Sequence, residues 1–164
     1  AAFTYMFGSG ISSAATIRVG IYSAQKNWME IKNAANTAIK LVLSIMGSFG
    51  VLLMILNNYL PMAFSKEPQI VQLAASLLII AAMFQLFDGL QVTIIGVLRG
   101  LEDVRVPTVI TLVGYWVIAL PLAYLLAYTF KMEVIGIWLA LLASLVFVGL
   151  SLWWRLTYLL KKNL

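Results

Sequence analysis

The sequence predicts an all-α membrane protein with about five transmembrane helices. Of its 164 residues, 63% are hydrophobic and only 10% are charged, far fewer charges than a soluble domain carries. The mean hydropathy is +0.99, and apolar runs long enough to cross roughly 30 Å of hydrocarbon recur along the chain. The predicted spans cover about 1–19, 38–60, 69–99, 107–130 and 134–155, with a cytoplasmic loop over 20–37.

The first span ends near Arg18 and Gly20. The chain opens with AAFTYMFGSG, which has neither an initiator methionine nor the basic region of a signal peptide. We therefore expect the chain to begin inside a membrane helix, with further sequence upstream. In the polar segment that follows, Asn27 can cap a helix, and Glu30 would complete a capping box three residues later.

Polar and proline-containing segments mark the boundaries of the remaining spans. The second span stops at NNYLP, and the third begins after SKEP with Pro68 in its first turn, a position that suits proline. LEDVRVP is a short loop, and its Pro107 opens the fourth span. KMEV forms a tight turn before the fifth span, which ends near Arg155.

The basic residues predict the orientation of these spans. With five spans, the segment 18–40, the loop 99–105 and the C-terminus share one side of the membrane and hold nine Lys and Arg residues, whereas the other side holds two. Short loops rich in Lys and Arg stay in the cytoplasm. We therefore predict a multi-pass protein of the plasma (inner) membrane with a cytoplasmic C-terminus. Basic residues dispersed at span ends do not indicate nucleic-acid binding.

Asp88 is the most unusual residue of the third span. With about 100° per residue, Gln85, Gln91 and Phe84 fall within about 60° of Asp88 and form one polar, aromatic-edged face. Four small residues form a second stripe, which permits close helix packing, and most of the others would face lipid. The small residues are Gly89, Thr93, Gly96 and Gly100; the lipid-facing set is Met83, Leu86, Phe87, Leu90, Ile94, Val97 and Leu98.

The depth of Asp88 predicts a role in ion binding. It lies eleven residues before Arg99, about 16 Å from the end of the span and near the membrane midplane. A charge at that depth costs several kcal/mol unless it faces protein or water. Protonation or a bound cation would lower the cost, as would a structural hydrogen bond to Gln85, Gln91 or a neighbouring helix. Functional acids are the commoner case in membrane spans, and every other Asp or Glu falls in a loop or at a span end.

Other residues admit two interpretations. Tyr5 and the hydroxyl residues of the first span either line a cavity that faces Asp88 or serve close helix packing. Pro121 is either a hinge or a kink that shapes the bundle. Arg18 and Arg99 either bridge to Glu102 or Asp103 or extend to lipid phosphates. Aromatic residues in the last two spans include interface anchors: Tyr115, Trp116, Trp138, Trp153, Trp154 and Tyr158.

The composition excludes most catalytic chemistry. Without Cys or His, the chain has no disulfide, thiolate metal site, haem ligand or catalytic histidine. It has no glycine-rich phosphate loop, and a single deep acid cannot supply the two facing carboxylates of an intramembrane aspartyl protease. We expect neither an enzyme nor a cofactor, and no metal ion beyond a cation at Asp88.

Four segments resemble the C-terminal lobe of multidrug and toxic compound extrusion (MATE) transporters of the NorM-like branch: SAATIRVG (13–20), FQLFDGLQVTIIGVLRGLEDVRVP (84–107), YWVIALPLAYLLA (115–127) and GIWLAL (136–141). The second segment carries a long motif, which includes the structural positions Arg99, Gly100, Asp103, Arg105 and Pro107. The resemblance implies a twelve-helix antiporter of two six-helix lobes, of which this chain supplies helices eight to twelve.

The resemblance also implies a function. Asp88 matches the aspartate of the family's helix ten, which binds the coupling Na⁺ or H⁺ while amphiphilic organic cations leave the cell. The expected partners are the bilayer, the N-terminal lobe, helix seven with its acid, and the small cationic substrates. Three positions depart from the family: Phe84 stands for a tyrosine found in some members, IYSAQKN replaces a glycine-rich turn, and Glu102 replaces a common glycine. The alternatives are a lipid-linked oligosaccharide flippase of the same superfamily and a membrane scaffold without transport.

Overall fold

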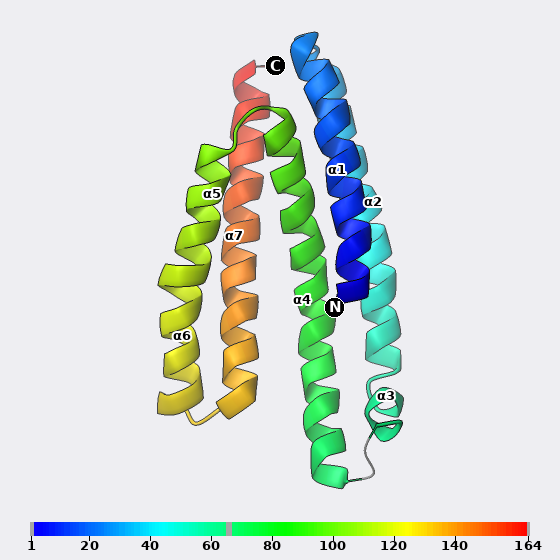
Figure 1. The fold of residues 1–164 in the computed structure, drawn as a ribbon, viewed down its shortest axis with the longest axis vertical. Helices are drawn as coiled ribbons and strands as arrows, with labels where there is room; N and C mark the ends of the chain where they lie inside the picture. The colour runs from blue at the N-terminus through cyan, green and yellow to red at the C-terminus, as the bar shows by residue number, and fades with distance from the viewer. Residues whose placement is uncertain (1, 65–66, 164) are drawn as a thin grey trace.

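The computed structural model describes residues 2–64 and 67–163, which are helical apart from short turns (Figure 1). This confirms the all-α prediction for the described residues. The helices are α1 (Ala2–Ala24), α2 (Trp28–Ile55), α3 (Tyr59–Met62), α4 (Pro68–Gly100), α5 (Arg105–Leu112), the π-helix η1 (Val113–Ala119), α6 (Leu120–Tyr124), the π-helix η2 (Leu125–Thr129) and α7 (Glu133–Asn163).

Four helical segments within the described part of the chain are long and apolar enough to cross a membrane. They are Trp28–Ile55, Pro68–Gly100, Arg105–Thr129 and Glu133–Asn163, and the third joins α5, η1, α6 and η2 end to end. The 23-residue α1 is not among them, because its serines, Thr16 and Arg18 lower its hydropathy. The crossing of the first predicted span therefore stays a prediction.

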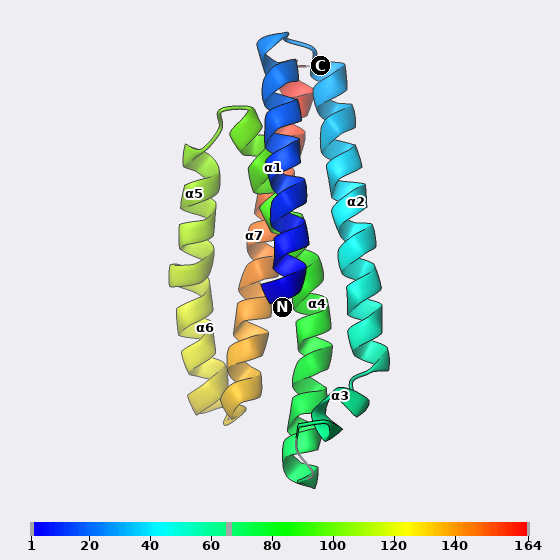
Figure 2. The ribbon, with the colours of Figure 1, turned by 45° about the vertical axis from the view of Figure 1, so that its right-hand side comes forward.

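The helix α4 is the centre of the bundle. It packs against α1 and α2 on one side and against α7 on the other, and the helix from Arg105 to Thr129 packs on α7 (Figures 1 and 2). The α1–α2 turn, the α4–α5 loop and the C-terminus lie at the same end of the bundle. The three basic regions that were predicted to share a side of the membrane therefore share an end of the fold.

The prediction of a loop over 20–37 is wrong. The helix α1 continues to Ala24 and α2 already begins at Trp28, so that only 25–27 lie outside a helix. The segment contains no proline and no glycine after Gly20, so nothing in it interrupts a helix. The cap at Asn27 is confirmed, because its side chain accepts a hydrogen bond from the Glu30 N–H at 3.2 Å. The capping box is incomplete, since the Asn27 N–H bonds the Tyr22 carbonyl instead, at 3.0 Å.

The other helix ends differ from the predicted spans by varying amounts. The ends of α4 lie within one residue of the prediction, and Pro68 occupies its first turn. The helix α2 ends at Ile55, five residues before the predicted end, ahead of the two asparagines of NNYLP. The helix α7 runs on to Asn163, because its last residues, TYLLKK, carry neither Gly nor Pro.

The small-residue stripe of α4 lies against α1 and α2, which agrees with the prediction that a helix packs closely on it. A Cβ on Gly96 would lie 2.6 Å from the Ser12 carbonyl oxygen, and one on Gly100 would lie 2.7 Å from that of Thr16. The predicted lipid-facing set is partly wrong: Ile94, Val97 and Leu98 are fully buried. The reason is that α4 has helical neighbours on more than one side. Near its C-terminal end, these neighbours cover faces of α4 that were expected to contact lipid.

Candidate functional site

The carboxylate of Asp88 lies in the interior of α4 and is half-buried. Within residues 2–64 and 67–163 it accepts no hydrogen bond and forms no ion pair. A buried charge without a partner is costly in a membrane span. The structural alternative, a carboxyl group held by Gln85, Gln91 or a neighbouring helix, is therefore not what the described part of the chain shows.

The two glutamines beside Asp88 are occupied by other helices. The Gln85 side chain donates from Nε2 to the Met46 carbonyl on α2 at 3.2 Å, while its buried Oε1 has no partner among the described residues. The Gln91 Oε1 accepts a hydrogen bond from the Tyr115 hydroxyl of η1 at 3.2 Å. The polar residues predicted around Asp88 therefore contact different helices: Gln85 bonds α2, whereas Gln91 bonds η1.

Phe84 and Tyr5 do not bond to Asp88. The Phe84 ring meets Trp138 of α7 edge-on, with ring centroids 6.0 Å apart, so it anchors α4 on α7. Tyr5 is 48% exposed on α1. Nearby on α1, the hydroxyls of Ser12 and Thr16 donate to the Val92 and Gly96 carbonyls of α4, both at 2.8 Å. For these two hydroxyls the structure shows helix packing, which was one of the two interpretations.

Tyr115 belongs to the surroundings of Asp88, although the sequence placed it among the interface anchors. Its hydroxyl donates a hydrogen bond to Gln91, which lies one helical turn from Asp88. Two contacts fix the helix beside it: Ser144 of α7 donates to the Gly114 carbonyl at 2.6 Å, and Val148 occupies the space that a side chain at 114 would need. The only sequence signal for this role was the position of Tyr115, eight residues beyond Pro107.

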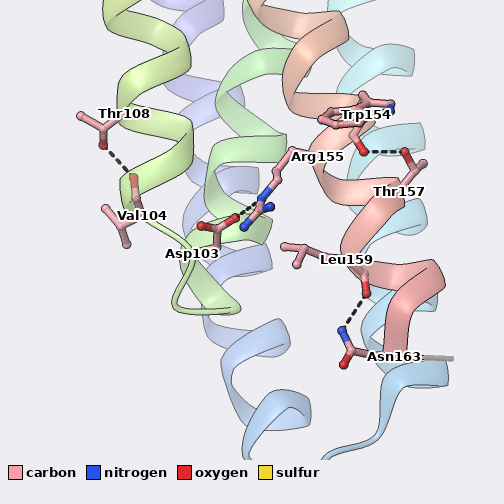
Figure 3. A network of polar contacts seen from close by, with 8 residues as sticks. All are labelled: Asp103, Val104, Thr108, Trp154, Arg155, Thr157, Leu159 and Asn163. Atoms are coloured by element: carbon pink, nitrogen blue, oxygen red, sulfur yellow. Dashed lines mark hydrogen bonds and ion pairs between the residues drawn. The ribbon is translucent and has the colours of Figure 1, made fainter.

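The motif residues gather where α4 ends and α5 begins. Asp103 accepts a hydrogen bond from the Arg155 Nε of α7 at 2.7 Å (Figure 3), and this ion pair was missed by the sequence analysis. The bridges proposed from Arg18 and Arg99 to Glu102 or Asp103 are not present in the described residues. Of the other positions that the resembling segments contain, Arg18 and Arg105 are exposed, Pro107 and Gly100 are buried, and Gly20 of α1 lies against the Gly100 carbonyl of α4.

Pro121 is exposed and lies in the short α6 between the π-helices η1 and η2. Proline lacks the N–H that the helical ladder needs, and π-helical turns are rare outside such interruptions. The altered winding on both sides of Pro121 shows that the helix is irregular here, whereas a hinge motion stays a prediction.

Comparison with known proteins identifies the family. The sequence profile of the MatE family matches residues 1–125. The chain belongs to the MatE family. It is 34% identical over 163 residues to the probable multidrug resistance protein NorM of Mesorhizobium japonicum, covering 94% of this chain and 35% of the relative. It is 35% identical to the multidrug resistance protein MdtK of Proteus mirabilis over 158 residues, 92% of this chain and 35% of that protein.

A solved structure agrees with this assignment. The crystal structure of the eukaryotic MATE transporter AtDTX14 superposes with a TM-score of 0.83 at 25% identity, over 98% of this chain and 36% of that one. The chain therefore has the multi-pass membrane fold of MATE transporters and spans about a third of the length of the relatives that it matches. The family predicted from the sequence motifs is confirmed.

Proposed function

We propose that this chain forms part of a cation-coupled antiporter that exports amphiphilic, mainly cationic drugs or metabolites, and that Asp88 binds the coupling Na⁺ or H⁺. Relatives at 34–36% identity are named as multidrug resistance proteins, and the similar crystal structure is that of a transporter. These names favour drug export over the flipping of a lipid-linked oligosaccharide, over a scaffold and over catalysis.

The observation that carries the proposal is the unpartnered carboxylate of Asp88. It lies inside a span of 33 residues and has no hydrogen bond or ion pair in the described part of the chain. Both adjacent glutamines have their own partners. A proton or a cation would neutralise the carboxylate, and nothing in the described helices has to be displaced when it arrives or leaves.

Asp88 is placed so that its charge can act on two groups of helices. One turn before it, Gln85 holds the α2 backbone; one turn after it, Gln91 holds Tyr115 of η1. Binding and release of a cation at Asp88 would change the electrostatic energy of both contacts and bias the lobe between inward-open and outward-open states. The N-terminal lobe and helix seven of the same transporter would complete the substrate cavity. The protein would lie in the inner membrane, with the basic end of the bundle on the cytoplasmic side.

The substitution Asp88→Asn tests the coupling role. In the complete transporter reconstituted in proteoliposomes, we expect Asp88→Asn to abolish substrate export driven by an imposed Na⁺ or H⁺ gradient, because the neutral amide takes up no proton and lacks the negative charge that would attract Na⁺. Substrate flux and the amount of folded protein are measured together. The matched control is Glu133→Gln, which neutralises an exposed acid at the start of α7 and should leave export unchanged. Gradient-driven export by Asp88→Asn at the wild-type rate would refute the role of Asp88.

A further inference from the structure

A small cavity lies between the end of α4 and the start of α5, at the basic end of the bundle. Its volume is about 200 Å³, and Arg99, Asp103, Thr108, Thr111 and Ile95 line it. Sites for drug-sized ligands are larger, roughly 300–1,000 Å³. The cavity therefore suits a small polar group rather than a transported drug. Figure 3 draws three of the lining residues, Asp103, Val104 and Thr108, and the hydrogen bond from Arg155 to Asp103.

The charge of the cavity is positive. The side chain of Arg99 makes no ion pair or hydrogen bond with any residue in 2–64 or 67–163. The acid of the lining, Asp103, is already paired with Arg155 at 2.7 Å. Arg99 therefore contributes to the lining a positive charge that no acid balances. The hydroxyls of Thr108 and Thr111 donate to backbone carbonyls of their own helix, so the cationic group that remains for a ligand is that of Arg99.

The surroundings place this cavity at the level of lipid headgroups. Trp154, the neighbour of Arg155 on α7, is 69% exposed and stacks on Tyr158, and exposed Trp and Tyr side chains mark the membrane–water interface. On the α5 side, Val104, Val109 and Leu112 are all at least half exposed. A ligand with an anionic head and apolar chains would place the head beside Arg99 in the cavity and the chains against the exposed apolar residues of α5.

We infer that the cavity bounded by Arg99, Asp103 and Thr108 binds the phosphodiester headgroup of an anionic phospholipid, with Arg99 as its cationic ligand. Basic pockets between membrane helices are suited to such headgroups, and an arginine donates two parallel hydrogen bonds to a phosphate. The acyl chains lie along the exposed apolar residues of α5. The site does not involve Asp88 and does not depend on the transport proposal.

Native mass spectrometry of the delipidated protein in detergent tests this site. Phosphatidylglycerol, phosphatidylcholine and inorganic phosphate are titrated separately. We expect wild-type protein to retain phosphatidylglycerol in preference to phosphatidylcholine, and Arg99→Gln to weaken phosphatidylglycerol binding about tenfold, the effect of losing a charge-assisted hydrogen bond. Arg105→Gln is the matched control, because Arg105 is exposed at the start of α5, at the same end of the bundle, but does not line the cavity.

A second variant distinguishes charge from damage to the loop. Asp103→Asn removes the negative charge of the lining and leaves Arg155 in place, so we expect it to bind phosphatidylglycerol more tightly than the wild type. Weaker binding by Asp103→Asn would show that loop structure, not charge, governs the binding and would overturn the proposal. Equal binding by Arg99→Gln and wild type, an equal loss in Arg105→Gln, or inorganic phosphate that binds as tightly as the lipid would also overturn it.

Discussion

Gly96 shows how the absence of a side chain lets α1 and α4 pack closely. A Cβ at this position would meet the backbone of Ser12, with the carbonyl oxygen at 2.6 Å. We expect Gly96→Ala to destabilise the protein by about 1–3 kcal/mol, the usual effect of overpacking, because a backbone carbonyl on a long helix cannot move aside alone. The midpoint of thermal unfolding in detergent measures the change.

Gly149 of α7 provides the matched control for that substitution. A Cβ there would have no neighbour within 4 Å, and alanine is the better helix former by about 0.5–1 kcal/mol. We therefore expect Gly149→Ala to be neutral or stabilising. The packing explanation fails if Gly96→Ala and Gly149→Ala shift the midpoint in the same direction by similar amounts.

Some of the site's residues could be identified from the sequence, and others could not. Asp88 was identifiable because it is the single acid deep in a span, which is a property of the residue and its own helix. The Tyr115–Gln91 and Arg155–Asp103 contacts join residues 24 and 52 positions apart. Helical periodicity says which face a residue occupies, but not which residue of another helix lies opposite. Nothing in the sequence alone therefore paired these side chains.

Two of the helix-ending turns place a charged residue where glycine would be unstrained. Lys26 has φ of 53° and Glu102 has φ of 62°, in the left-handed region. In both turns, a pair of backbone hydrogen bonds closes the helix end. In the first turn, the Lys26 N–H bonds the Ser23 carbonyl and the Asn27 N–H bonds the Tyr22 carbonyl, both at 3.0 Å. In the second, the Glu102 N–H bonds the Arg99 carbonyl at 3.0 Å and the Asp103 N–H bonds the Leu98 carbonyl at 2.9 Å. This pattern usually has glycine at the left-handed position.

Glycine at either position should stabilise the protein. A left-handed conformation costs a non-glycine residue roughly 1–2 kcal/mol, and the added flexibility of glycine in the unfolded chain offsets part of the gain. We expect Lys26→Gly and Glu102→Gly each to raise stability by about 0.5–1 kcal/mol, seen as a higher midpoint of thermal unfolding. Gln25→Gly is the control, because Gln25 is exposed and has no left-handed φ; stabilisation by Gln25→Gly of equal size would contradict the explanation.

The helix boundaries were predicted most accurately where proline, glycine or a capping residue marks the end of the helix. The helix α4 was placed within a residue at each end because Pro68 and LEDVRVP mark its limits. The polar segment 20–37 was mistaken for a loop because polarity shows where a helix leaves the hydrocarbon, whereas glycine, proline and caps show where it ends. Only Asn27 carried such a signal, and the structure places the second helix directly after it.

In the whole molecule, α4 connects two groups of helices and carries Asp88 between them. The helices α1 and α2 pack on one side of α4 and α7 packs on the other, and hydrogen bonds through Gln85 and Gln91 leave α4 in both directions within one turn of Asp88. The sequence predicted the number of long helices closely, the common end of the basic regions and the family. It did not predict the arrangement around α4, because packing partners are set by contacts between segments distant in sequence.

The central claim is that the carboxylate of Asp88 exchanges a cation or a proton while the protein is folded. Infrared difference spectroscopy of the purified complete protein, between Na⁺-free and Na⁺-loaded samples and between high and low pH, observes this carboxyl group directly. We predict a carboxyl band that responds to one of the two ions and is absent from Asp88→Asn. A spectrum unchanged by either ion, or a responding band that Asp88→Asn retains in full, would contradict the account.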